Sequence, residues 1–316
     1  MSATPLTQPP PPAAGLLARS TLFLLMCGLF GGLLWWTKAP QIFWYAMPVL
    51  FCAVLLWEAL RPAQNIQNSG WRRWPANGVL WALNMIIGGE VGQACVLLIV
   101  SLHLPYGRGW VTNTFDSLVT STLFCVVVLD FWQYLFHRLM HRWAWLWRIH
   151  RVHHSDRDYD LTTGLRFHPL EGVLTIFWRL APVVLLGMPR EALLVNAMLV
   201  LWVDFFTHAN VRLPSRLERA LRTILITPAL HRIHHSLDTT DDRRNFGTIF
   251  SFWDRFFETL RQRSVQKQPV PLTGVDNIPT ARSLGTMHTL MMPFAPLPPA
   301  PRPPRKSRSH RSTRTR

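Results

Sequence analysis

The sequence predicts an all-α protein: an integral-membrane helical bundle of about four to six membrane helices with a histidine-rich helical cap. Three observations predict this fold class. Hydrophobic residues make up 49% of the 316 residues and include 15 tryptophans. The apolar residues fall in blocks close to the roughly 20 residues that cross a bilayer as a helix. Ten of the 13 histidines lie between His137 and His235, mostly at the ends of these blocks.

The N-terminal part of the chain contains three apolar blocks. Residues 1–18 are rich in proline and are predicted to be disordered. The blocks run from Leu22 to Trp36, from Ile42 to Leu60 and from Val79 to Leu104. The first block resembles a signal peptide, but no small-residue cleavage site follows and the second block begins within a few residues. We therefore expect residues 19–114 to form N-terminal membrane helices.

Three further blocks run from Phe115 to Phe136, from Gly172 to Gly187 and from Ala192 to Phe206. The last two are short for a full span, so they are predicted to form a hairpin that dips into or just crosses the bilayer. Arg179 in the first of these two argues against a full crossing. Residues 263–316 are predicted to form a C-terminal extension that ends in a disordered, basic, proline-rich tail.

Basic residues next to the apolar blocks predict the orientation in the membrane. Arg61, Arg72 and Arg73 lie between the second and third blocks, and loops rich in positive charge tend to stay in the cytoplasm. This rule predicts that the N-terminus and every histidine-rich segment lie on the cytoplasmic side of the membrane, which would be the inner membrane in a bacterium. The net charge of +16 would also suit nucleic acid, but no nucleic-acid-binding pattern is present, so no such partner is expected.

Histidines cluster in two stretches that have the spacing of metal ligands. The stretch DFWQYLFHRLMHRWAWLWRIHRVHH contains His137, His141, His150, His153 and His154. The stretch TPALHRIHHS contains His231, His234 and His235. Spacings of three and four residues place side chains on one helix face, and neutral imidazole is a common metal ligand. Eight nitrogen donors exceed the needs of one four-coordinate ion, so two metal ions are predicted.

Other metal chemistries are excluded by the spacing of the residues. The sequence lacks the HExxH motif of zinc peptidases and the HxE and PCxxC motifs of zinc deaminases. No glutamate has a histidine three residues later, as a ferritin-like di-iron site requires. The four cysteines form no CxxC motif, so the predicted metal chemistry depends on histidine. Imidazole suits iron, and iron that activates O2 needs an open coordination position.

These motifs resemble the fatty acid hydroxylase/sterol desaturase superfamily of membrane di-iron enzymes, and most closely its bacterial, sterol-desaturase-like branch. The superfamily pattern HxxxH, HxxHH, HxxHH matches His137–His141, His150–His154 and His231–His235. The segments HRVHHSDRDYDLTTGLRFHPLE, HAN and NFGTIFSFWDRFF also match. The resemblance covers roughly residues 115–262, which we predict to be the di-iron hydroxylase/desaturase domain.

The resemblance implies further site residues. The superfamily tends to place another histidine ligand between the second and third clusters, and His208 fits that position. His168 is predicted as a ligand, a second-shell hydrogen-bond donor or a packing residue. Asp130, two helical turns before His137, and Asp204, one turn before His208, are predicted to support ligands as second-shell carboxylates. No catalytic residue is predicted outside this metal site.

The resemblance also implies an activity. Two iron ions would use O2 and two external electrons to hydroxylate or desaturate a C–H bond of a lipid, such as a sterol-like, fatty acyl or isoprenoid substrate. Neither reaction is preferred by the sequence. No electron-carrier motif is present, so a separate ferredoxin or cytochrome with an NAD(P)H-dependent reductase is the expected partner. The alternative is a membrane metal-binding protein without oxidative activity, such as a transporter or sensor, whose polar path would involve Glu90 and Arg179.

Overall fold

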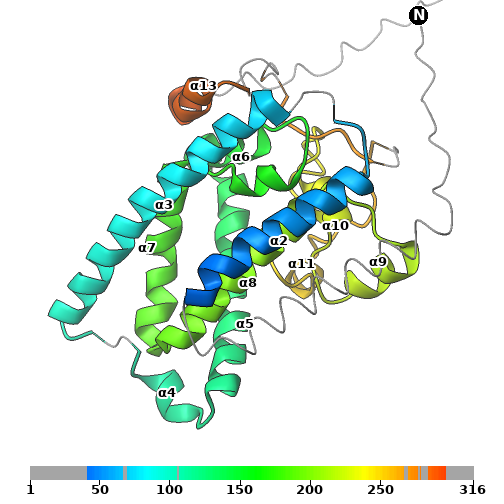
Figure 1. Cartoon of the computed structure of the whole chain (residues 1–316). Coiled ribbons are helices and arrows are strands. Elements are labelled where there is room, and N and C mark those ends of the chain that lie inside the picture. Colours follow the sequence, from blue (N-terminus) through cyan, green and yellow to red (C-terminus); the bar gives the residue numbers. More distant parts are fainter. Residues whose placement is uncertain are drawn as a thin grey trace, which may run out of the picture.

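The computed structural model describes residues 41–66, 70–104, 107–266, 270–276, 278 and 284–296. Within these residues the protein is helical and contains isolated β-bridges but no strands, which confirms the predicted all-α membrane bundle (Figure 1). The long helices are α2 (Gln41–Leu60), α3 (Gly70–Ser101), α5 (Leu118–Arg142), α7 (Pro169–Leu186) and α8 (Arg190–His208). The shorter ones are α4 (Trp110–Thr114), α6 (Ala144–His154), α9 (Ser215–Leu221), α10 (Pro228–His234), α11 (Phe252–Phe256), α13 (Thr286–Met291) and the 3-10 helices η1 (Leu161–Leu165) and η2 (Met292–Phe294).

Four helices are long and apolar enough to cross a membrane: residues 72–101, 118–142, 169–186 and 190–208. They correspond to the last four predicted blocks, while α2 contains a shorter apolar stretch and the predicted block Leu22–Trp36 lies outside the described residues. α5 extends beyond the apolar block that ends at Phe136. It continues through His137 and His141 to Arg142, so a single helix connects the apolar bundle to the histidines.

α5 and α8 run toward one end of the bundle and α3 and α7 run away from it, and this end forms the cap (Figure 1). The start of α3, the end of α5, the start of α7 and the end of α8 lie near α6 and α10, whereas α4 and the α7–α8 turn lie at the opposite end (Figure 1). α8 packs against α5, α2 and η1, and its Trp202, Val203 and Phe206 belong to the buried core. All predicted histidine-rich segments therefore lie at the same end of the bundle.

Arg179 is accommodated inside the bundle by a polar partner on the neighbouring helix. Its guanidinium donates to the side-chain oxygen of Asn196 on α8. Two tryptophans brace the same helix, because the indole N–H of Trp132 donates to the Trp178 carbonyl (2.7 Å) and that of Trp178 donates to the Trp132 carbonyl (2.8 Å). This hydrogen bond lowers the cost of burying Arg179 in α7, an 18-residue helix that is long and apolar enough to cross a membrane.

The turn between α7 and α8 depends on a close contact between two glycines. Gly187 ends α7 with φ 60°, and a Cβ at this position would lie 2.5 Å from the Cα of Gly109.

We expect Gly187→Ala to destabilise the protein by at least about 1 kcal/mol. Alanine would have to adopt the left-handed backbone conformation, and its Cβ would clash with the backbone of Gly109. Thermal unfolding in detergent measures the effect. Gly89→Ala is the control, since no atom lies within 4 Å of its Cβ position in α3; an equal loss of stability in both variants would contradict the prediction.

Candidate metal centre

The structure brings the nine histidines that were predicted as metal ligands together in two adjacent groups. Within each group the ligand atoms lie within 4.8 Å of one another, and all nine side chains are buried. The first group contains His137, His141, His150, His154 and His234; the second contains His153, His208, His231 and His235.

Each HxxHH motif contributes to both groups, because adjacent histidines on a helix point in different directions. On α6, His150 and His154 belong to the first group and His153 to the second. α10 and the residue after it repeat this division, with His234 in the first group and the other two histidines in the second. The ring of His154 in the first group stacks on the ring of His235 in the second, with the ring centres 4.2 Å apart, so the two groups are in direct contact.

Hydrogen bonds fix the ring orientation in the first group. His137 donates from Nδ1 to the Phe246 carbonyl, and His150 donates from Nδ1 to Glu171 Oε1, both at 2.8 Å. The Nε2 atoms of these two rings therefore carry lone pairs, yet they lie only 3.1 Å apart. His234 follows the same pattern, since its Nδ1 donates to the Arg244 carbonyl at 2.7 Å. A cation bound by the inward-facing nitrogens would relieve this repulsion.

The second group is oriented by His208 at the end of α8. Its Nδ1 donates to the Asp204 carbonyl at 2.8 Å, and its Nε2 lies 3.2 Å from His153 Nε2 and 3.1 Å from His231 Nε2. Gly164 in η1 makes room for this helix end, because a Cβ there would lie 3.0 Å from the Asp204 carbonyl oxygen. The close packing of η1 against α8 thus holds His208 in position.

The donor set fits metal ions in both charge and hydrogen bonding. Burial, together with neighbouring imidazoles, lowers the pKa of His153, His154, His231 and His235 well below the usual value and that of His234 to about 3. Neutral imidazole is the form that binds metals. Among the described residues, several buried ring nitrogens have no hydrogen-bond partner, including Nε2 of His141, His154, His234 and His235. Buried polar atoms without a partner are costly, and metal coordination would satisfy them.

His168 lies outside both groups, so the prediction that it is a ligand is not supported by its position. Its Nδ1 accepts from the Leu170 N–H at 3.1 Å, which makes it the N-cap of α7, and its Nε2 lies 3.1 Å from the Leu290 carbonyl. A side chain that precedes a helix beginning with Pro169 is in the position to cap it, and this local hydrogen bond takes the place of coordination.

The two predicted carboxylate supports also have different partners. Among the described residues, the hydrogen-bond partners of Asp130 are not histidines; its oxygens accept from the backbone N–H groups of Ile249 and Phe250 and from the Trp253 indole N–H. It therefore anchors the segment before α11 to α5. Asp204 does support His208, but the acceptor is its main-chain carbonyl rather than its carboxylate.

Glu171 is the carboxylate that does contact a ligand, and the sequence interpretation missed its role. We expect Glu171→Gln to lower metal affinity and turnover by about 10–100-fold, because the Glu171 side chain accepts from Nδ1 of His150 and so fixes the tautomer and the orientation of that ring. Metal retention during titration with a chelator, measured beside turnover, tests this. Glu191→Gln, on the exposed first turn of α8, is the matched control. Equal metal retention in both variants would contradict the role.

A buried ionic network joins α3 to the loop after α6. Arg73 donates to Asp156 Oδ2 at 2.8 Å and also to Asp160 Oδ2, and all three side chains are at most 2% exposed. Thr163 donates to Asp156 Oδ2 at 3.0 Å. Burial alone would raise the pKa of Asp156, but Arg73 and Arg166 hold it below its usual value. The network fixes the segment that follows His153 and His154.

Taken together, a bundle of apolar helices and two buried histidine groups at one end of it are typical of an integral-membrane protein, and each histidine group could hold a metal ion. A family model described as "Fatty acid hydroxylase" matches residues 122–259. Sphinganine C4-monooxygenase 1 of Arabidopsis thaliana is 33% identical over 73% of this chain and 89% of its own length. The chain therefore belongs to the fatty acid hydroxylase/sterol desaturase superfamily, as the motifs predicted.

Other relatives match a smaller part of the chain. An ornithine lipid hydroxylase of Rhizobium tropici is 34% identical over 43% of this chain and 40% of its own length. The human alkylglycerol monooxygenase is 32% identical over 42% of this chain and 28% of its own length. The chain thus spans less than half the length of these two relatives. No solved structure matches the chain.

Proposed function

We propose that this protein is an O2-dependent di-iron membrane oxidoreductase that hydroxylates a C–H bond of a lipid. One observation carries the proposal: two adjacent groups of buried histidines lie where apolar helices end. This position puts a metal centre at the face of a bilayer, with apolar helices beside it to accept a lipid chain. The similarity to lipid-modifying relatives supports the same activity.

Iron is the metal that best suits this donor set. Zinc sites are almost always four-coordinate and often contain cysteine, whereas the first group alone offers five imidazoles. Imidazole nitrogens also suit iron, and only a redox-active metal fits an oxygenase. When bound, an iron pair supplies the O2 and redox chemistry that breaks an unactivated C–H bond.

Hydroxylation is favoured over desaturation by the relatives, because the similar proteins named above are hydroxylases or monooxygenases. Their names refer to ornithine lipid, alkylglycerol and sphinganine, so they share a long-chain lipid as the general class of substrate. We infer the same class for this chain.

The residues of this chain contribute positioning and exclusion of water. The Phe246 and Arg244 carbonyls and Glu171 hold three imidazoles with Nε2 facing inward, so little reorganisation is needed when metal binds. Burial of all nine histidines keeps water from competing with substrate and O2. Electrons would come from a separate ferredoxin or cytochrome with its reductase, docking on the cap, which the positive-inside rule places in the cytoplasm.

Metal analysis and isotope labelling test the proposal. The full chain is purified in detergent from iron-supplemented cells, and about two irons per chain in a coupled pair are expected by Mössbauer spectroscopy. Incubation of the loaded protein with lipid extract, a reductase system and O2 labelled with heavy oxygen should place one labelled atom in a product lipid. A new double bond without label would indicate desaturation instead. Folded protein that binds metal but never consumes O2 would favour the transporter or sensor alternative.

A further inference from the structure

Glu90 is an ionisable residue in the middle of a candidate membrane span. It is the single charged residue between Trp74 and Ser101 in α3, about 24 Å beyond the first and about 16 Å before the second at 1.5 Å per residue. α3 is one of the four helices that are long and apolar enough to cross a membrane. A carboxyl group at that depth is costly in hydrocarbon and almost always has a polar partner.

The described part of the chain provides no such partner. The side chains of Glu90 and of Gln93, three residues later, are exposed, and neither makes a hydrogen bond or an ion pair with the described residues. Asn84 in the same helix differs, because its amide donates to the Leu80 carbonyl at 3.1 Å and to the Phe167 carbonyl. α3 therefore uses one polar side chain inside the protein and directs two others outward.

The outward face of α3 has the spacing of a coiled-coil seam. Exposed residues recur on it at alternating intervals of four and three: Ile86, Glu90, Gln93, Leu97 and Val100. The opposite side contains the buried Cys95 and Ile99, and α3 itself lies at the outer edge of the bundle (Figure 1). Alternating intervals of four and three are the repeat with which two parallel helices pack against each other.

A second copy of the chain supplies the groups that this face lacks. All copies insert with the same orientation, so two α3 helices would pack in parallel around a twofold axis along the membrane normal. Each seam residue then faces its own counterpart. A protonated carboxyl group both donates and accepts a hydrogen bond, and so does a carboxamide, so Glu90 and Gln93 can each pair with the same residue of the other copy.

The predicted apolar block of residues 22–36 is the alternative occupant of this face. It contains no carboxyl, carboxamide or basic side chain. Packing of this block on α3 would therefore leave Glu90 and Gln93 without side-chain partners of the kind that a second α3 offers.

We propose that the outward face of α3 is a dimerisation surface on which a second copy of this chain packs, with hydrogen bonds between the two Glu90 side chains and between the two Gln93 side chains. Helices associate in a bilayer through close packing and interhelical hydrogen bonds, because lipid is as apolar as leucine. Polar residues at seam positions also fix the register of two helices. The dimer requires neither metal nor turnover, so its test is independent of the proposed oxidation.

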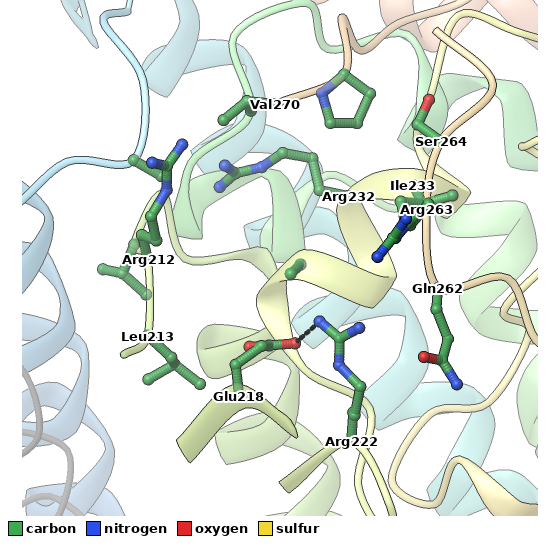
Figure 2. A pocket seen from close by; sticks show the side chains of 14 residues that line it. Arg212, Leu213, Glu218, Arg222, Arg232, Ile233, Gln262, Arg263, Ser264 and Val270 are labelled. Atoms are coloured by element: carbon green, nitrogen blue, oxygen red, sulfur yellow. Dashed lines mark hydrogen bonds and ion pairs between the residues drawn. The ribbon is translucent and has the colours of Figure 1, made fainter. Parts of the chain in front are cut away.

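A dimer through α3 leaves the surface around α10 uncovered. The cavity of about 470 Å³ beside α10 is lined by α9, α10 and the segments that follow α2, α8 and α11, and none of its lining residues belongs to α3 (Figure 2). α3 and α9 lie on opposite sides of the bundle (Figure 1). Both copies would therefore keep this part of the cap accessible to an electron donor.

Disulfide trapping in native membranes tests the surface. The full-length protein with Cys52→Ala, which removes the exposed cysteine of α2, also receives either Leu97→Cys on the seam or Leu98→Cys as the matched control. The two leucines are adjacent and similarly exposed, at 64% and 59%. We expect mild oxidation to join two chains at position 97 and not at position 98, because one residue turns the helix by about 100°. A disulfide to Cys27 within one chain would assign the face to residues 22–36 and overturn the proposal.

Energy transfer between donor- and acceptor-labelled chains in liposomes measures the association itself at several protein-to-lipid ratios. The variant Glu90→Leu with Gln93→Leu should associate at least about tenfold more weakly, because both polar pairs are lost and leucine is well accommodated by lipid. Glu90→Gln should associate as the unaltered protein does, since a carboxamide can also pair with its counterpart. Circular dichroism confirms that the variants are folded. Unchanged association of the double leucine variant, or equal crosslinking at positions 97 and 98, would refute the dimer surface.

Discussion

The variant His234→Ala is expected to lose turnover almost completely, by far more than the roughly 100-fold upper range for residues that only support a ligand. His234 is fully buried, and its Nδ1 is held by the Arg244 carbonyl, so Nε2 faces the other four histidines of the first group. Alanine removes this donor without adding bulk. Iron per chain should fall from about two toward one, because the second group keeps all four of its histidines.

The exposed residue His288 on α13 provides the matched control for this prediction. His288→Ala should keep turnover and iron content, since it lies in neither histidine group. His150→Ala should repeat the loss seen with His234→Ala, because the two residues share the first group. Full turnover in both group variants, with folded protein in the membrane, would refute the site assignment.

Much of the composition of the two histidine groups could be predicted because their side chains follow helical spacing. The HxxHH repeats place imidazoles on one side of a helix, and every predicted histidine of the repeats does lie in one of the two groups. The division between the groups could not be predicted. Whether His153 or His154 belongs to a given group depends on how α6 is rotated against α10, and this rotation is set by tertiary packing.

The groups that orient the ligands were harder to predict than the ligands themselves. Main-chain carbonyls orient His137, His208 and His234. Every residue has a carbonyl, so no side-chain pattern identifies these acceptors. The prediction for Asp130 was wrong for a related reason: backbone N–H groups of a distant segment use its carboxylate instead. Glu171 directly follows the sequence HPL and lies on the first turn of α7. This position was the feature from which its contact with a predicted ligand could have been inferred.

α5 and α8 each run without interruption from the apolar bundle into the cap, so the same helices that form the bundle also position histidines of the two groups. Both helices are candidate spans, and each has a predicted ligand, His141 or His208, in its last turn. A shift of either helix along its axis would therefore displace the imidazole nitrogens of His141 or His208 by the same distance. Since metal coordination tolerates only about 0.2 Å, the packing of the spans and the geometry of the centre depend on each other. Contacts that fix the spans to the cap should thus affect both stability and metal content.

The variant Arg73→Met tests this coupling and is expected to destabilise the protein by about 3–5 kcal/mol, the cost of leaving buried charges without their partner. Arg73 is the cation between Asp156 and Asp160, and it also donates to the Asp158 carbonyl. Methionine nearly fills its volume but removes the ion-pair partner of Asp160 and leaves Asp156 with Arg166 as its neighbouring cation. Loss of order in this loop should reach His153 and His154, so iron content should fall together with the unfolding midpoint in denaturant.

Arg72→Met is the control for this prediction, because the neighbouring arginine is exposed and the charge change is the same. The double variant Arg73→Met with Asp160→Asn should recover part of the lost stability, since removing both ends of a buried ion pair costs less than removing one. A change in fold alone would not produce such recovery. If Arg73→Met unfolds at the same denaturant concentration as Arg72→Met, the network does not hold the cap to α3, and the positions of His153 and His154 must be fixed by the imidazole packing itself.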